Sequence, residues 1–173
     1  MTIQTTIQML QPMKRRNRVM AIELNTKLIH DFLDKNGWKY KYIPEKELYF
    51  GNVGLKGVIS MVEFLICMSD THVTAYFRLP VSARECLRPL AEFITRANYG
   101  LHLGCFELDF NDGEIRYKMS ISNTALEANP DDEMGLMMSI PCGTIDTYAS
   151  GIIGVLSGYE EPEDAVKRCE ENR

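Results

Sequence analysis

The chain has 173 residues, of which 45% are hydrophobic and 25% are charged, and its formal net charge is −5. This length fits one domain, and a chain of this size buries enough apolar surface to fold without a metal or a disulfide. The composition excludes collagen-like and wholly disordered chains, and the acidic balance argues against nucleic acid as the main partner.

The basic side chains are concentrated at the N-terminus, where residues 1–20 contain Lys14, Arg15, Arg16 and Arg18 and no acidic residue. We expect residues 1–20 to form a flexible basic tail and residues 21–173 to form a single domain. The tail lacks the apolar run of a secretory signal, and no stretch approaches the roughly 20 apolar residues of a membrane span. The sequence therefore predicts a cytoplasmic protein that engages neither membranes nor nucleic acid.

The cysteines are odd in number, widely spaced and without a C-x-x-C pair, so they indicate free thiols in a reducing compartment. They are Cys67, Cys86, Cys105, Cys142 and Cys169.

The N-terminal part of the domain begins with a predicted helix, which Asn25 or Thr26 can cap and which Gly37 ends. Aromatic and lysine side chains then alternate over residues 38–42, which predicts a strand that ends at Pro44. Short β-rich runs predict further strands over residues 48–50, 58–68 and 73–79.

The middle of the chain predicts a second helix after Pro80, which is expected to stop the preceding strand. Ser82 and Glu85 have the spacing of a capping box. Pro89 lies too far into a helix that starts at Ser82, so either the helix kinks there or it starts near Arg88.

Residues 105–121 predict a β-hairpin, because apolar and charged residues alternate on both sides of Asp112-Gly113, a favoured two-residue turn. This turn sets a register with one apolar face. It places Phe110 opposite Ile115, Leu108 opposite Tyr117, Phe106 opposite Met119, Asp109 opposite Arg116 and Glu107 opposite Lys118.

The last third predicts helices. Asn129 and Pro130 start one that Pro141 ends or kinks, a second covers residues 145–156, and Pro162 opens a third. The order of elements lacks regular β–α alternation. We therefore expect an α+β fold of two layers, an antiparallel sheet with helices packed on one face.

Residues 98–101, 104–110 and 112–117 carry a resemblance. A helix ends in Asn, and after a turn of small residues come Phe-x-Leu-Asp, an acidic-Gly turn and an Arg-bearing return strand. This pattern resembles the YbjN-like family, which consists of sensory transduction regulators that share the fold of type III secretion chaperones. The resemblance is best over residues 82–157 and looser over 22–80. It implies a type III secretion chaperone-like fold and a cytoplasmic, non-catalytic homodimer that holds or senses another polypeptide.

Catalytic and cofactor motifs are absent from the sequence. Residues 51–57 are rich in glycine but lack the P-loop pattern. His102 and Cys105 lack the further ligands that a zinc site needs, and residues 131–133 fit the acidic first turn of a helix. We predict no catalytic residue, cofactor or metal.

Two groups of residues are candidates for partner binding, although each is also typical of core packing. An aromatic group near one end of the sheet could take an extended peptide by strand addition, and a Met-rich helical group could adapt to varied partners. They are Tyr40, Tyr42, Tyr49 and Phe50, and Met134, Met137 and Met138.

The leading functional hypothesis is a non-enzymatic protein-binding module, chaperone-like or regulatory, that acts as a homodimer. The alternative is a small-molecule sensor or enzyme with a pocket between the sheet and the helices. A third hypothesis, nucleic-acid binding, would rest on the basic segment 14–18 alone.

Overall fold

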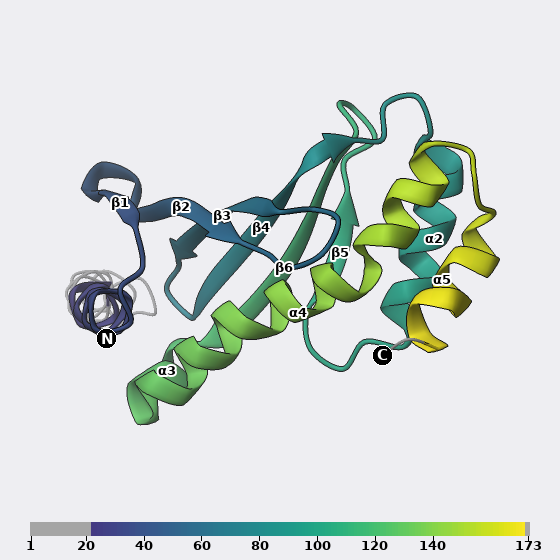
Figure 1. The fold of residues 1–173 in the computed structure, drawn as a ribbon. Coiled ribbons are helices and arrows are strands. Elements are labelled where there is room, and N and C mark those ends of the chain that lie inside the picture. Colours follow the sequence, from purple (N-terminus) through teal and green to yellow (C-terminus); the bar gives the residue numbers. More distant parts are fainter. Residues whose placement is uncertain (1–21, 172–173) are drawn as a thin grey trace, which may run out of the picture.

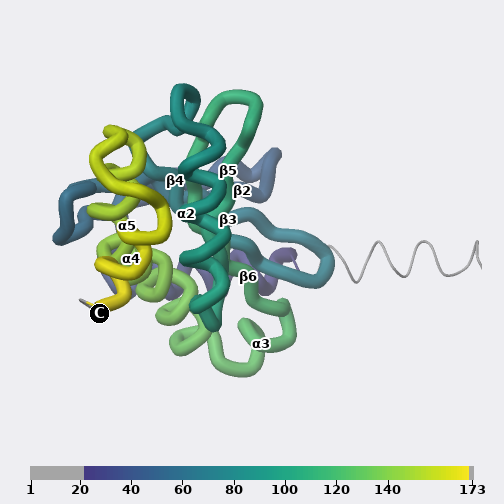
Figure 2. The backbone as a smooth tube through the Cα atoms, turned by 90° about the vertical axis from the view of Figure 1, so that its right-hand side faces the viewer, coloured from purple at the N-terminus to yellow at the C-terminus, as the bar shows by residue number. Residues whose placement is uncertain are grey.

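The computed structural model describes residues 22–171, so the predicted basic tail of residues 1–20 lies outside the described residues. The described chain forms a six-stranded sheet and five α-helices (Figures 1 and 2). The strands are β1 (Tyr40–Ile43), β2 (Leu48–Gly54), β3 (Met61–Met68), β4 (His72–Ser82), β5 (Cys105–Leu108) and β6 (Glu114–Ser122). The helices are an N-terminal helix that covers residues 22–35, α2 (Leu87–Tyr99), α3 (Asn123–Ala128), α4 (Pro130–Leu156) and α5 (Pro162–Glu171).

Every neighbouring pair of strands is antiparallel, and the strand order is β1-β2-β3-β4-β6-β5. The helix α2 connects β4 to β5, and the chain then returns through β6 into the place beside β4. The two edges of the sheet are therefore β1 and β5. The prediction of an α+β fold with an antiparallel sheet is confirmed.

The helices cover one face of the sheet. In β3, Phe64 is fully buried whereas the residues on either side are half-buried, because side chains alternate across a strand. Ring contacts join this buried face to the helices. The ring of Tyr49 lies 5.0 Å from that of His30 in the N-terminal helix, and Phe106 lies 5.9 Å from Tyr148 of α4. Figures 1 and 2 show α4 crossing the sheet, with α2 and α5 packed against its C-terminal half.

The start of the N-terminal helix differs from the prediction. Residues 22–35 are helical, so Asn25 and Thr26 lie within the helix and cap nothing at its start. Asn25 is fully buried, and Thr26 supplies the carbonyl that accepts a hydrogen bond from the Tyr49 hydroxyl at 3.1 Å.

Pro80 does not stop β4, which continues to Ser82 through a register shift between Arg78 and Ser82. Proline has no backbone N–H to donate to a neighbouring strand. A β-bulge tolerates it because the extra residue of a bulge is not paired in the ladder. Of the two alternatives for α2, the structure has the later start, at Leu87, which places Pro89 in the first turn. Ser82 does not cap α2, because the helix begins at Leu87 and Cys86 holds its N-cap position. The Ser82 hydroxyl instead donates to the Asp112 carbonyl at 3.0 Å.

The predicted register of the β5–β6 hairpin is wrong by two residues, because Phe106 lies opposite Tyr117 and not opposite Met119. Four residues separate Asp109 from Glu114, and the Asp109 carbonyl accepts a hydrogen bond from Gly113 N at 2.8 Å. A shift of two keeps the side chains of the two strands on their predicted faces. Phe110 is the exception, because it lies in the loop and is 59% exposed, not opposite Ile115 on the apolar face. Aspartate side chains inside the loop accept backbone hydrogen bonds that a two-residue turn cannot form.

Pro141 neither ends nor separates helices, because α4 is a single helix of 27 residues with Pro141 inside it. The short helix α3, which the sequence pattern did not predict, precedes it. The helix α5 begins at Pro162 as predicted.

Candidate functional site

The sheet surface opposite the helices, here called the open face, is the candidate functional site. One row of directly opposed residues crosses it from edge to edge. This central row consists of Lys41, Phe50, Leu65, Tyr76, Lys118 and Cys105. The three residues in its middle are apolar or aromatic and half-buried, although no described helix covers them. The row therefore presents an apolar strip with a cation near each end.

Beside the central row, a charged network holds two arginines directly opposite each other. Arg78 and Arg116 are partners in the β4–β6 ladder, an arrangement that like charges disfavour. Glu114 offsets the repulsion, because its carboxylate lies 3.7 Å from Arg78 and 3.6 Å from Arg116. Glu63 pairs with Arg78 at 2.5 Å, and Glu107 pairs with Arg116 at 2.8 Å.

Glu107 also pairs with Lys118, so one carboxylate serves two cations. Burial alone would raise its pKa, but the hydrogen bonds from Lys118 and Arg116 outweigh that effect, and the pKa of Glu107 is lowered. The Arg116 guanidinium also lies 4.3 Å from the centre of the Tyr76 ring, a cation–π contact. Glu107, Arg116 and Lys118 are therefore stabilised in their charged forms.

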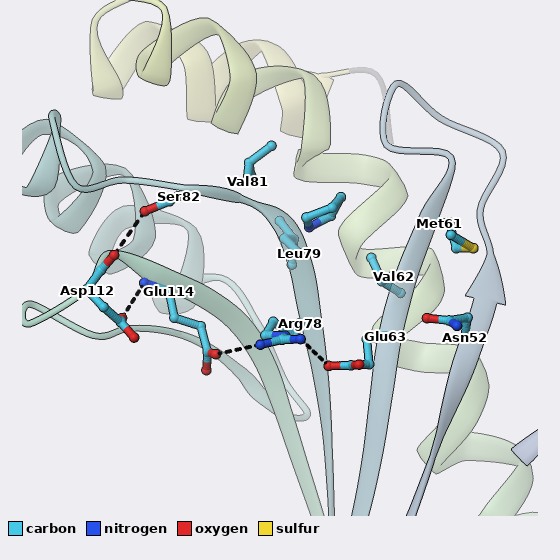
Figure 3. A pocket seen from close by; sticks show the side chains of 11 residues that line it. Asn52, Met61, Val62, Glu63, Arg78, Leu79, Val81, Ser82, Asp112 and Glu114 are labelled. Atoms are coloured by element: carbon cyan, nitrogen blue, oxygen red, sulfur yellow. Dashed lines mark hydrogen bonds and ion pairs between the residues drawn. The ribbon is translucent and has the colours of Figure 1, made fainter. Parts of the chain in front are cut away.

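A depression of about 480 Å³ lies at the end of the open face where β4 bulges. Figure 3 shows the side chains that line it. Arg78 lies between Glu63 and Glu114 on one side of it (Figure 3). Met61 and Val81 line the other side. This geometry can receive a small group, but the one cation in its lining, Arg78, is already paired with Glu63 and Glu114.

A second depression, of about 350 Å³, lies along the β1 edge, where Lys39, Lys41 and Phe50 contribute to its lining. The Lys41 ammonium lies 5.8 Å from the centre of the Phe50 ring. Among the described residues, neither lysine has a carboxylate within ion-pair distance. Glu63 also lines this depression, but its carboxylate pairs with Arg78. The β1 edge therefore combines an apolar ring with two cations that form no ion pair within residues 22–171.

The opposite edge, β5, is closed by a side chain. The Asn98 amide nitrogen donates to the Phe106 carbonyl at 2.9 Å, and the Phe106 N–H donates to the Asn98 amide oxygen at 2.8 Å. Asn98 thus occupies both backbone groups that an added strand would use at Phe106. Within residues 22–171, β1 has no backbone partner beyond β2 and its own turn.

The aromatic candidates from the sequence divide between the two faces. Phe50 lies on the open face, whereas Tyr40, Tyr42 and Tyr49 point to the helix-covered face. Tyr49 is fully buried, so it is a core residue. Tyr40 and Tyr42 are half-buried beside the ring of His30. The structure therefore brings only part of this group to a surface.

On the helix-covered face, the Tyr40 hydroxyl links two polar side chains of the N-terminal helix, His30 and Asp34. This hydroxyl donates to Asp34 Oδ1 at 2.8 Å and lies 2.7 Å from His30 Nδ1. Burial and the Asp34 carboxylate raise the pKa of Tyr40 to about 12. The phenol therefore remains protonated at neutral pH and orients the edge strand against the N-terminal helix.

The methionine candidates are core residues. Met134, Met137 and Met138 are each at most 2% exposed, which removes them from any surface that a partner could contact in this conformation. The sequence did not single out Lys39, Lys41 or Asn98 as functional, although the alternation of lysine and aromatic residues over 38–42 was visible.

The described residues contain no cluster of three or more His, Cys, Asp or Glu side chains arranged to hold a metal ion. All five cysteines are free thiols. No helix in residues 22–171 is long and apolar enough to cross a bilayer. Burial, with the nearby Asp146 carboxylate, raises the pKa of Cys142 to about 11, so this thiol remains protonated at neutral pH.

Comparison of the chain with protein-family models, with curated proteins and with solved structures gives no match.

Proposed function

We propose that this chain is a non-enzymatic protein-binding module, chaperone-like or regulatory, which acts as a homodimer and binds another polypeptide in extended form along β1. The observation that carries the proposal is the asymmetry of the two sheet edges. Asn98 occupies the outward backbone groups of Phe106 in β5, whereas β1 has no partner on its outer side among the described residues. An edge strand with free N–H and C=O groups is a template for an added strand.

The open face supports the homodimer part of the proposal. Phe50, Leu65 and Tyr76 form a continuous apolar strip that no described helix covers, and uncovered apolar strips of this kind mark interaction surfaces. The resemblance of residues 82–157 to the YbjN-like family belongs to the same proposal. It rests on residues 98–117, which include Asn98 and Phe106, and the hydrogen bonds between these two residues occupy the edge at Phe106.

The test combines native mass spectrometry with hydrogen exchange on the protein purified gently from its own host. We expect a dimer that carries a stoichiometric polypeptide, and we expect amides of Tyr40–Ile43 to exchange more slowly in the complex than after the polypeptide is removed. Exchange at Phe106 serves as the internal control, because Asn98 already protects it.

Two results would contradict the proposal. A bare monomer, or a monomer with a small-molecule adduct, would favour a sensor or an enzyme with a pocket. A bound polypeptide that leaves exchange in Tyr40–Ile43 unchanged would show that β1 is not its site.

A further inference from the structure

The charges of the β1 edge indicate which polypeptide it would take. Residues 22–171 contain 24 acidic and 14 basic side chains, so carboxylates outnumber cations in the described part of the chain. Arg78, Arg116 and Lys118 on the open face are all paired. Lys39 and Lys41 are exposed and unpaired among the described residues, and they lie at the one edge that an incoming strand can reach.

We propose that the β1 edge selects an extended polypeptide in which carboxylate and apolar side chains alternate, with the carboxylates facing Lys39 and Lys41. This inference rests on the proposed function of β1 as a peptide-binding edge. A strand added to β1 extends the central row by one residue beyond Lys41, and directly opposed residues of opposite charge stabilise a sheet.

The helix-covered face of β1 favours the apolar side chains of the proposed polypeptide. Tyr40 and Tyr42 alternate with Lys41 and point to the helix-covered side. Their rings lie 5.7 and 5.0 Å from the ring of His30, so this side of the edge is aromatic. Every second side chain of the added strand would lie beside these rings, where apolar side chains are favoured over charged ones.

A second copy of this chain fits the edge poorly. Pairing of β1 with β1 of another copy would bring together two sets of unpaired lysines, and like charges across a ladder destabilise it. The strand β5 does have alternating apolar and acidic residues, in Phe106, Glu107 and Leu108. Its edge is closed by Asn98, and Glu107 is already paired with Arg116 and Lys118. We therefore infer a different polypeptide.

The test uses three labelled nine-residue peptides with blocked ends, in which Val alternates with Glu, with Lys or with Thr. Each is titrated by fluorescence anisotropy against the full chain, the double variant Lys39→Glu/Lys41→Glu and the control Lys167→Glu, an exposed lysine of α5. Backbone amide exchange of Tyr40–Ile43 reports where each peptide binds. All proteins keep the basic segment 14–18, so a change between variants cannot come from it.

We expect the full chain to bind the Glu peptide about tenfold more tightly than the Lys peptide, and the double variant to reverse this preference. The Lys167→Glu control should behave like the unchanged protein. Retention of the Glu preference by the double variant would overturn the inference.

Two further outcomes separate this inference from the proposed function. If all three peptides bind equally and protect β1, the edge binds polypeptides without the charge rule, so the inference fails alone. If none protects β1 and the double variant self-associates, the lysines only guard an edge against aggregation, and both proposals for β1 fail.

Discussion

The side-chain amide of Asn98, near the end of α2, forms a two-way hydrogen-bonded pair with the backbone of Phe106 in the edge strand β5, at 2.9 and 2.8 Å. The amide reproduces the donor and acceptor of a neighbouring strand. This single side chain both anchors α2 to the sheet and ends the sheet at β5.

Replacing Asn98 with Ala should lower the free energy of unfolding by roughly 1–3 kcal/mol, because it leaves the backbone groups of the buried Phe106 without partners. The opened edge should also promote self-association. Urea denaturation and light scattering measure the two effects. The control is Lys167→Ala, an exposed lysine of α5, which should change stability by no more than about 0.5 kcal/mol. Equal behaviour of the two variants would show that Asn98 does not close the edge.

Gly104 lies in the loop that leads into β5 and has a φ of +71°. A methyl group there would lie 2.6 Å from Tyr117 Cε1 and 2.7 Å from the Lys118 carbonyl oxygen. Gly104→Ala should therefore cost more than about 2 kcal/mol, from left-handed backbone strain and from the clash together. Gly158→Ala is the matched control, since its φ is +67° and nothing lies within 4 Å of the added methyl. It should lose only about 1–2 kcal/mol, and a loss as large as that of Gly104→Ala would refute the clash.

The pairing of Glu107 with Lys118 and Arg116 predicts a pH dependence of stability. The pKa of Glu107 is lower in the folded protein than in the unfolded chain, where a glutamate titrates near about 4.3. Its stabilising contribution is therefore complete at neutral pH. That contribution decreases once the pH falls below about 4.3 and is lost as the pH passes through the lowered pKa. Urea midpoints measured from pH 7 downward should fall less steeply for Glu107→Gln than for the unchanged protein. Parallel curves would contradict this assignment.

A substitution at Met137 tests whether the methionines of α4 are core residues or partner-binding residues. Met137 is fully buried, so Met137→Ala should cost about 2–5 kcal/mol of unfolding free energy through lost packing and a cavity. Peptide binding at β1 should remain unchanged at temperatures where the variant is folded. Leu136→Ala is the neighbouring control, because Leu136 is 44% exposed and should cost far less. A binding defect in folded Met137→Ala would return the methionines to the candidate site.

The β5–β6 hairpin shows how far local sequence information extends. The alternation of residues 105–121 correctly predicted two strands and the faces of the side chains within them, but it placed Phe110, which lies in the loop, on the apolar face. It did not predict the register, because the loop also contacts a distant segment: Ala83 N donates to the Gly113 carbonyl at 2.9 Å. That contact joins residues 30 apart in the chain, so it cannot be predicted from the sequence of the hairpin alone.

Proline positions show the same limit. Pro80 and Pro141 are breakers by local rules, yet one lies inside β4 and the other inside α4. In α4, burial of the helix against the sheet and α5 compensates for the hydrogen bond that Pro141 cannot donate. Asp146 is a charged residue within an apolar stretch of α4. Its carboxylate accepts a hydrogen bond from Gly57 N at 2.9 Å, which links the β2–β3 loop to α4.

The sequence by itself determined the α+β class, the antiparallel strands, the free cysteines and the inward face of each strand, because the periods of 2 and 3.6 residues are local properties. Only the tertiary structure decided which strands are edges, which of the aromatic candidates are buried and which cations lack partners. Those properties depend on residues far apart in the chain. Asn98 reaches Phe106 because α2 packs beside β5, and Lys41 is unpaired because β1 ends the sheet.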